Sequence, residues 1–114
     1  MAEATPGYEA FQQLEMRVGR IARAEAHPKA RKPSLKLWID FGPELGTRTS
    51  SAQLADYYTP ETLPGRLVVC AMNLGLRNIA GFMSEVLTLG APDPEGRVVL
   101  LAVEREVPLG GRVF

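Results

Sequence analysis

The segment 35–41, LKLWIDF, alternates strictly between two kinds of residue, and this pattern constrains the fold more than any other feature of the chain. Leucine, isoleucine and phenylalanine occupy its odd positions, and Lys36, Trp38 and Asp40 occupy its even positions. Successive side chains of a strand point to opposite faces, so the odd positions would share one apolar face. The segment is therefore predicted to be a half-buried strand whose apolar face covers the core of a sheet.

A tight turn and a second, polar strand follow this segment. Residues 42–46, GPELG, combine two glycines, which permit positive φ, with a proline that has no backbone donor. Residues 47–51 are predicted to return as the short second strand of a hairpin. The outer face of this hairpin would carry Lys36, Trp38, Arg48 and Ser50. Such groups hold phosphates and stack on bases, although an ordinary solvated sheet face has the same composition.

The length and composition are those of one globular domain. A chain of 114 residues can build a single core, but its burial is incomplete, so a partner subunit would add stability. The hydrophobic content of 46% and charged content of 23% exclude the disordered and collagen-like classes. No apolar run approaches the roughly 18 residues that span a bilayer, and the start lacks a signal-peptide pattern. We therefore expect a cytoplasmic protein without membrane insertion.

Charge is unevenly distributed along a chain whose net charge is zero. Residues 17–48 hold eight basic and three acidic residues, a local charge of +5, and the remainder carries −5. Zero net charge argues against a sequence-blind polyanion binder. The basic segment instead indicates a local anion site, although segregation of this size also arises by chance.

The sequence offers little for catalysis or metal binding. The single cysteine, Cys70, lies in an apolar run and is predicted to be a small buried residue rather than a nucleophile. The single histidine, His27, precedes Pro28 and has no cluster of ligand residues around it. No motif places a base beside Ser50 or Ser51. We therefore expect a protein that is not an enzyme and that has no catalytic residues, metal or cofactor.

The remaining segments complete a five-stranded order. A helix from Pro6 to Leu14, with Thr5 as its N-cap, is predicted to precede a strand at 16–24. The apolar phase of this strand slips at Gly19, which indicates a bulge or a sharp bend. The other predictions are a helix at 51–58, strands at 66–73, 82–89 and 97–103, a loop at 75–81 and a docked tail at 107–114.

This order of elements matches the five-stranded barrel of the oligonucleotide/oligosaccharide-binding (OB) fold. The predicted fold class is therefore all-β. It is an OB-fold barrel with a short helix between its third and fourth strands and with N- and C-terminal extensions. A generic small β-barrel would have a similar pattern.

Several segments also resemble the tRNA-binding domain family over nearly the whole chain. They are RVGRI (17–21), HPKARKPSLKLWIDFG (27–42), SSAQL (50–54), YYTPETL (57–63), VVCAMNL (68–74) and IAGFMSEVLTLG (79–90). The segments RKPSLKLWIDFG and SSAQ are most similar to the stand-alone CsaA-type branch, a group of secretion-related chaperones. The resemblance implies one tRNA-binding-type OB domain over residues 1–114, and a homodimer whose terminal extensions cover the interface.

The resemblance also implies a surface that faces tRNA. Its predicted contacts are Arg31 and Lys36 to phosphate; Ser50, Ser51 and Gln53 to backbone or base; Asn73 and Arg77 at one side; and Met83, Ser84 and Glu85 on the adjacent strand edge. Glu85 would accept from base amino groups or orient an arginine, and a plain salt bridge is an equal alternative. The loop 73–78 holds one cation, fewer than is common in the family, which implies a weaker grip on tRNA.

Two functions therefore remain open at this stage. The first is a structure-selective tRNA- or RNA-binding homodimer that also acts as a secretion-related chaperone. The alternative is an export chaperone that binds unfolded or exported polypeptides and has no significant RNA binding. Its dimer groove would be lined by Tyr8, Phe11, Phe82, Met83 and Phe114. The same five residues would also serve as the plain core of a dimer interface.

Overall fold

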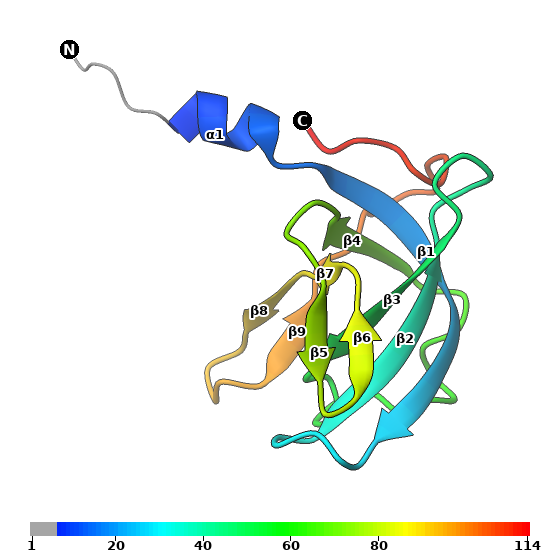
Figure 1. The fold of residues 1–114 in the computed structure, drawn as a ribbon, viewed down its shortest axis with the longest axis vertical. Coiled ribbons are helices and arrows are strands. Elements are labelled where there is room, and N and C mark those ends of the chain that lie inside the picture. The colour runs from blue at the N-terminus through cyan, green and yellow to red at the C-terminus, as the bar shows by residue number, and fades with distance from the viewer. Residues whose placement is uncertain (1–6) are drawn as a thin grey trace.

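The computed structural model describes residues 7–114 of the chain. Its elements are α1 (Gly7–Gln13), β1 (Met16–His27), β2 (Ser34–Asp40), β3 (Thr47–Ala52), β4 (Leu67–Ala71), β5 (Arg77–Ile79), β6 (Phe82–Ser84), β7 (Leu87–Thr88), β8 (Gly90–Pro92) and β9 (Val98–Leu100). Figure 1 shows a curled sheet with α1 projecting from one end and the C-terminus beside it. In this part of the chain, no helix has the length and apolar character needed to cross a membrane.

The sheet closes into the predicted OB-fold barrel. Five antiparallel strands follow the order β3-β2-β1-β4-β7, which leaves β3 and β7 at the two edges. The edges meet where the Thr88 hydroxyl donates a hydrogen bond to Ser50 Oγ at 2.8 Å. The backbone N–H groups of Glu85 and Val86 also donate to the carbonyl of Thr49, at 2.8 and 3.1 Å. Closure satisfies edge groups that an open sheet would expose, and it confirms the predicted fold class.

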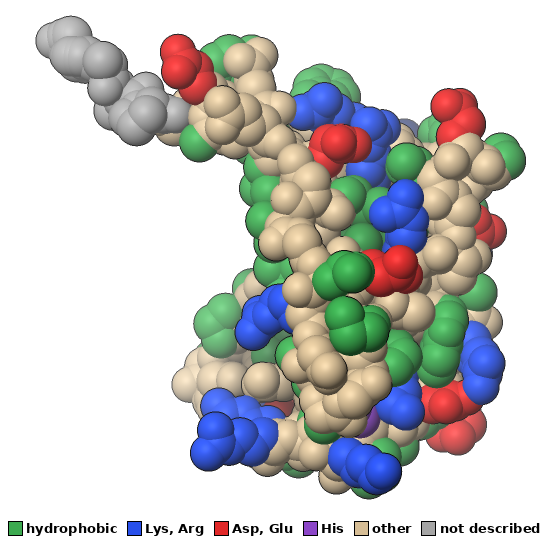
Figure 2. Space-filling view, viewed as in Figure 1, with side chains coloured by type: hydrophobic (Ala, Val, Ile, Leu, Met, Phe, Trp, Pro, Cys, Tyr) green, Lys and Arg blue, Asp and Glu red, His purple; other side chains and the backbone are tan. Residues whose placement is uncertain are grey.

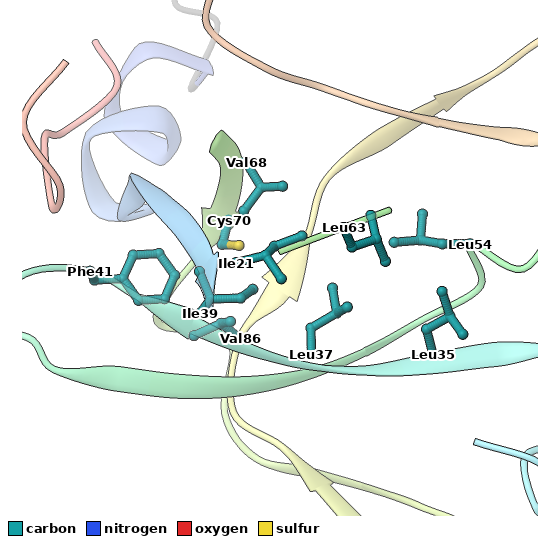
Figure 3. Packing of buried hydrophobic residues seen from close by; sticks show 10 residues of the cluster. All are labelled: Ile21, Leu35, Leu37, Ile39, Phe41, Leu54, Leu63, Val68, Cys70 and Val86. Carbon is teal, nitrogen blue, oxygen red and sulfur yellow. The ribbon is translucent and has the colours of Figure 1, made fainter. Parts of the chain in front are cut away.

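The core runs along the apolar face of β2, as the alternation predicts. Leu35, Leu37 and Ile39 are buried, and Phe41 continues the row just past the strand. Figure 3 shows these side chains in line, with Leu54 and Leu63 closing the end near Leu35. A contiguous cluster of this kind supplies most of the hydrophobic stabilisation of a small domain.

The pairing register of β2 and β3 corrects one prediction about the outer face. The turn sets Asp40 opposite Thr47, so inward-facing Leu37 lies opposite Ser50 and outward-facing Trp38 lies opposite Thr49. Ser50 is consequently 0% exposed. A shift of one residue moves every side chain of a strand to the other face. The outer face therefore carries Thr49 and Ser51, and the prediction that it carries Arg48 and Ser50 is wrong.

The predicted helix between the third and fourth strands is also wrong, because turns occupy that place. Ser51 and Ala52 stay in β3, so Ser51 is not available as a helix cap. A single helical hydrogen bond remains, from the N–H of Tyr58 to the carbonyl of Leu54 at 3.1 Å. The segment follows the end of the barrel and buries Leu54 and Leu63 there.

The residues after β4 form more regular structure than the predicted loop, and the predicted strand at 82–89 is interrupted. Strands β5 and β6 pair as a hairpin, with Ile79 opposite Phe82. Its two turn residues, Ala80 and Gly81, both have positive φ, at 49° and 89°. This pattern matches the type I′ turn, whose twist suits a two-residue hairpin. The chain then breaks at Glu85, whose N–H turns to Thr49, before β7 begins.

Strand β1 continues to His27, and its bulge is not at Gly19. The register shift lies between Ile21 and Arg23. There the backbone of Ile21 bonds to Gly65 and Arg66, just beyond the last pair with β4. Gly19 has a different role, because a Cβ at this position would lie 2.6 Å from Cγ2 of Ile39 and 2.7 Å from the ring of Phe41. The missing side chain provides space for these two core residues.

The C-terminal tail docks, as predicted, against its own chain. Its backbone pairs with β1 beyond the end of β2, with hydrogen bonds from Val18 N to Gly111 O (3.0 Å) and from Gly110 N to Val18 O (2.8 Å). The helix predicted at the other end is observed as α1, and its expected cap residues Thr5 and Pro6 lie outside the described residues. Both terminal extensions thus leave the barrel at the same end (Figure 1).

The close approach at Gly19 generates a stability prediction. We expect Gly19→Ala to lower the free energy of unfolding by about 1–3 kcal/mol, because the new methyl group must displace Ile39 or Phe41. Gly7→Ala is the matched control, since nothing lies within 4 Å of the position that its new methyl group would take. Urea unfolding at fixed protein concentration measures the free energy of unfolding of both variants. Equal stability of Gly19→Ala and wild type would contradict this packing argument.

Candidate nucleic-acid interface

Aromatic rings and cations interleave on the outer face of β1 and β2. The guanidinium of Arg23 lies 4.4 Å from the centroid of the Trp38 ring, and Arg23 also pairs with Glu25. Phe82 of the β5–β6 hairpin meets Trp38 edge to face, with ring centroids 5.6 Å apart. The Lys36 ammonium lies 5.4 Å from the Phe82 ring. Cation–π contacts of this kind hold the positive charges at fixed positions on the sheet.

His27 lies beneath this cluster and supports it. Its ring is buried and meets the Phe82 ring edge to face, with centroids 5.7 Å apart. Its Nδ1 lies 3.1 Å from Ser51 Oγ, a hydrogen bond whose direction depends on the tautomer. Its Nε2 has no partner within residues 7–114. The sequence predicts only that His27 ends its strand, whereas its ring also anchors the hairpin.

The loop between β1 and β2 carries the densest positive charge. It contains Lys29, Arg31 and Lys32, none of which forms an ion pair with any residue of 7–114. The arginines of β1 differ, because Arg17 and Arg20 pair with glutamates at 3.0 and 2.7 Å. Figure 2 shows Lys and Arg side chains gathered at the end of the molecule where this loop lies. Lys36 and Arg48 also form no ion pair with residues 7–114, so the uncompensated cations of the basic segment are these two and the three of the loop.

A groove beside this loop brings together three of the predicted contact residues. Ser51, Gln53 and Arg77 line a hollow of about 400 Å³ between β3, β5 and β9. Ser34 lines this hollow and also the next one, which Arg31 lines. Arg31 and Arg77 thus belong to one continuous surface. Lys36 follows Ser34 two residues along β2, and Met83 is exposed on β6.

Three other predicted contacts are engaged within the protein. Ser50 accepts from Thr88 inside the barrel, and buried Ser84 accepts from the N–H of Ser51 at 3.0 Å. The Glu85 carboxylate accepts from Thr49, from N–H at 2.9 Å and from the hydroxyl at 3.0 Å. Neither sequence interpretation of Glu85, as a base acceptor or as a salt bridge, predicts this contact. Glu85 instead completes the free edge of β3.

Asn73 is also committed to the protein. Its side-chain amide donates to the Gln13 carbonyl at 2.8 Å, and its carbonyl accepts from the Glu15 N–H at 2.9 Å. These two bonds tie the end of α1 to the end of β4. Asn73 therefore positions the N-terminal extension, and it does not line the groove that contains Arg77.

The predicted peptide groove divides between two places. Tyr8, Phe11 and Phe114 line a hollow of about 490 Å³ between α1 and the C-terminal tail. Phe82 and Met83 lie on the β5–β6 hairpin, where Phe82 packs against Trp38. Figure 1 shows α1 projecting from the top of the barrel, whereas the hairpin lies lower down, on the side of the barrel. Within one protomer, the five residues expected in the dimer groove thus form two separate surfaces.

Sequence reasoning missed the roles of Arg23 and Thr49. The alternation pattern alone could have found Arg23, because a strand paired antiparallel with β2 must place some β1 cations on the outer face beside Trp38. The position of Thr49 on the outer face depends on how the β2–β3 turn sets the pairing register. The sequence determines this register less clearly than it determines the face on which Trp38 lies.

Cys70 lies inside the barrel and donates a weak hydrogen bond to the Thr88 hydroxyl, with Sγ and Oγ1 3.7 Å apart. Burial raises the pKa of its thiol to about 12, and the hydrogen bond to Thr88 offsets only part of this increase. A thiol with such a pKa is a poor nucleophile. Among residues 7–114, no three His, Cys, Asp or Glu side chains gather as metal ligands would.

The comparison with protein families decides the assignment. The family model described as "Putative tRNA binding domain" matches residues 16–112. The chain belongs to the tRNA-binding domain family. This confirms the resemblance found in the sequence, and the description names a binding function rather than a reaction.

Related members of the family occur both inside larger proteins and as stand-alone chains. The methionine-tRNA ligase of Methanocaldococcus jannaschii is 37% identical over 103 residues, which are 90% of this chain and 15% of that protein. This chain thus spans about 15% of the length of that curated relative. The CsaA chaperone of Bacillus anthracis is 41% identical with a TM-score of 0.86, covering 99% of this chain and 100% of that chain. The MetRS-related protein of Pyrococcus horikoshii is 32% identical with a TM-score of 0.83, and each chain is fully covered.

The environment of Cys70 predicts slow thiol chemistry. At pH 8, a pKa of about 12 leaves roughly one thiol in ten thousand ionised, against about a quarter for an ordinary cysteine. We expect Ellman's reagent to leave the native protein unmodified over an hour and to react within minutes in concentrated guanidinium chloride. Native protein that reacts as fast as unfolded protein would contradict the buried position.

Proposed function

We propose that this member of the family binds tRNA through the groove and basic loop on one side of its barrel. The observation that carries the proposal is the family match, which covers the five strands of the barrel and the four strands of its two hairpins. The predicted contacts that remain accessible are Arg31, Lys36, Ser51, Gln53, Arg77 and Met83. The charges support this function, because the loop cations have no partner among residues 7–114 and are available to phosphates.

The strength of this binding should fall as salt is added. Each phosphate that a cation neutralises releases counterions, and log K then falls by a little under one unit for each tenfold increase in salt. For a neutral protein with few accessible cations, we expect a moderate slope of log K against log salt. The interface therefore combines a small electrostatic contribution with hydrogen bonds from Ser51 and Gln53.

A salt titration with bulk tRNA tests the proposal. We expect the triple variant Arg31→Ala, Lys36→Ala, Arg77→Ala to bind at least tenfold more weakly at low salt. The slope of log K against log salt should become shallower by about one unit for each phosphate contact that the variant loses. Fluorescence anisotropy of labelled tRNA measures both quantities.

The matched control removes the same charge elsewhere. The triple variant Arg66→Ala, Arg97→Ala, Arg105→Ala loses three cations that line neither the groove nor the hollow beside the loop. We expect it to bind like wild type. Equal weakening of both triple variants would show that only net charge matters, and wild type that binds no tRNA at low salt would overturn the proposal.

The hollow between α1 and the tail favours a second function, that of a cytoplasmic, homodimeric chaperone of the CsaA type. Tyr8 is 71% exposed and Phe114 is fully exposed, although both are aromatic and line the same hollow. Exposed apolar patches of this kind mark sites of protein association. The Bacillus anthracis relative, named a chaperone, matches the chain over its whole length, which supports this assignment. The partners would be a second copy of the chain and unfolded or exported polypeptides.

Removal of the two aromatic rings tests this function. We expect Tyr8→Ser, Phe114→Ser to shift sedimentation toward the monomer and to reduce the suppression of aggregation of a chemically denatured model enzyme. Tyr57→Ser is the matched control, because Tyr57 is also exposed but lies far along the chain, beside Asp93. If the double variant dimerises and suppresses aggregation as well as wild type, this surface is neither the dimer interface nor the site that binds polypeptides.

A further inference from the structure

Three adjoining hollows form a continuous track along the face that includes Arg31 and Arg77. The hollow at the β1–β2 loop shares Ser34 with the central groove. The central groove shares Ser51, Arg77, Ile79 and Leu87 with a third, smaller hollow near Leu74. A track of this form suits an extended, flexible strand better than a rigid duplex, which would need a wide, shallow surface.

The central groove is built like a slot for one planar group. Ile79 of β5, Leu87 of β7 and Val98 of β9 give it an apolar lining, to which buried Leu54 also contributes. Gln53 lines it with an amide that both donates and accepts hydrogen bonds. Its volume of about 400 Å³ lies in the range of sites for small ligands. Apolar sides with one amide are suited to a nucleobase, which has an apolar face and a polar edge.

The charge of the track selects an anionic occupant. The residues that line the three hollows include Arg31 and Arg77 and no aspartate or glutamate. Glu85, which adjoins the lining residues Ser84 and Val86 in the sequence, accepts hydrogen bonds from Thr49 instead. A peptide of mixed charge would gain little here, whereas a phosphate beside Arg77 would gain a charge-assisted hydrogen bond.

The aromatic ring on the outer face is not available for the same purpose. The guanidinium of Arg23 lies over Trp38, and the Phe82 ring meets it edge to face. Stacking a base on Trp38 would require one of these contacts to break. The slot therefore offers the more accessible apolar surface for a base.

We propose that the central slot binds a single unpaired nucleotide of RNA. The base lies between Ile79 and Val98 with its polar edge at Gln53, and its phosphate lies at Arg77. The neighbouring hollows take the nucleotides before and after it. This inference rests on the proposed RNA-binding function and specifies it: the protein contacts an unpaired segment of the RNA, in addition to any contact with duplex.

Two tryptophan substitutions test the slot from different strands. Ile79→Trp and Val98→Trp each place a large ring in the slot without changing charge, and Val99→Trp adds the same ring on β9 outside the lining residues. The probes are a fluorescein-labelled single-stranded decauridylate, a blunt RNA duplex of ten base pairs, and bulk tRNA. Circular dichroism and urea unfolding confirm that each variant is folded before binding is compared.

We expect Ile79→Trp and Val98→Trp to weaken decauridylate binding by on the order of tenfold, the scale of one lost stacking contact. Val99→Trp should bind like wild type, and the duplex should bind more weakly than the single strand to these two proteins. Photocrosslinking with 4-thiouridine in the same oligonucleotide should mark residues 77–79 or 87–98.

The outcomes separate this inference from the function on which it rests. If wild type binds tRNA but neither slot variant changes the binding of decauridylate or tRNA, the slot is not a nucleotide site and the proposed function stands. The same conclusion follows if crosslinks occur only on the outer face of β1 and β2. If wild type binds none of the three RNAs, both proposals fail.

Discussion

The burial of the apolar face of β2 is the interaction on which the rest of the structure depends. β2 lies between β1 and β3, and its inward row from Leu35 to Phe41 contacts the whole length of the core. Because that row faces inward, the opposite face must carry Lys36 and Trp38, and the partner strands must match this division. Gly19 on β1 shows how tightly the match is made, since the core leaves no space for a side chain there.

The consequences of this division reach the candidate interface. The β5–β6 hairpin lies against the polar face of β2 through Phe82, which contacts Trp38, His27 and Lys36. The hairpin in turn places Arg77 and Ile79 beside the end of β3. A groove lined by residues from β2, β3, β5, β7, β8 and β9 thus depends on the packing of one aromatic side chain. Sites assembled on the strands of a closed barrel have the rigid support that loop sites lack.

The sequence predicted the strands more reliably than the positions of their side chains. The alternation in 35–41 identified β2 and its buried face, because period-two patterning responds directly to burial. The outer face of β3 was wrong, because its parity depends on how the turn pairs Asp40 with Thr47. The predicted helix at 51–58 is absent for a tertiary reason. Ser51 stays in β3, where it pairs with Lys36, and the turns carry Leu54 and Leu63 into the core.

The candidate site was also predicted only in part. Arg31, Gln53 and Arg77 lie along adjoining hollows, as a binding surface requires. Four other predicted contacts make their hydrogen bonds within the protein: Ser50, Ser84, Glu85 and Asn73. A sequence gives the identity of a polar group, but only the fold shows whether its hydrogen-bonding capacity is already used.

The pairing of the C-terminal tail with β1 has a consequence for synthesis of the chain. The backbone of Arg17 pairs with that of Arg112, so this edge of β1 has no strand partner until residues 110–112 have left the ribosome. Every other pair of the barrel forms between residues already synthesised by then. Contacts that span so much sequence form slowly. A nascent chain stalled before Gly110 would therefore present an open strand edge to the chaperones that meet it at the exit tunnel.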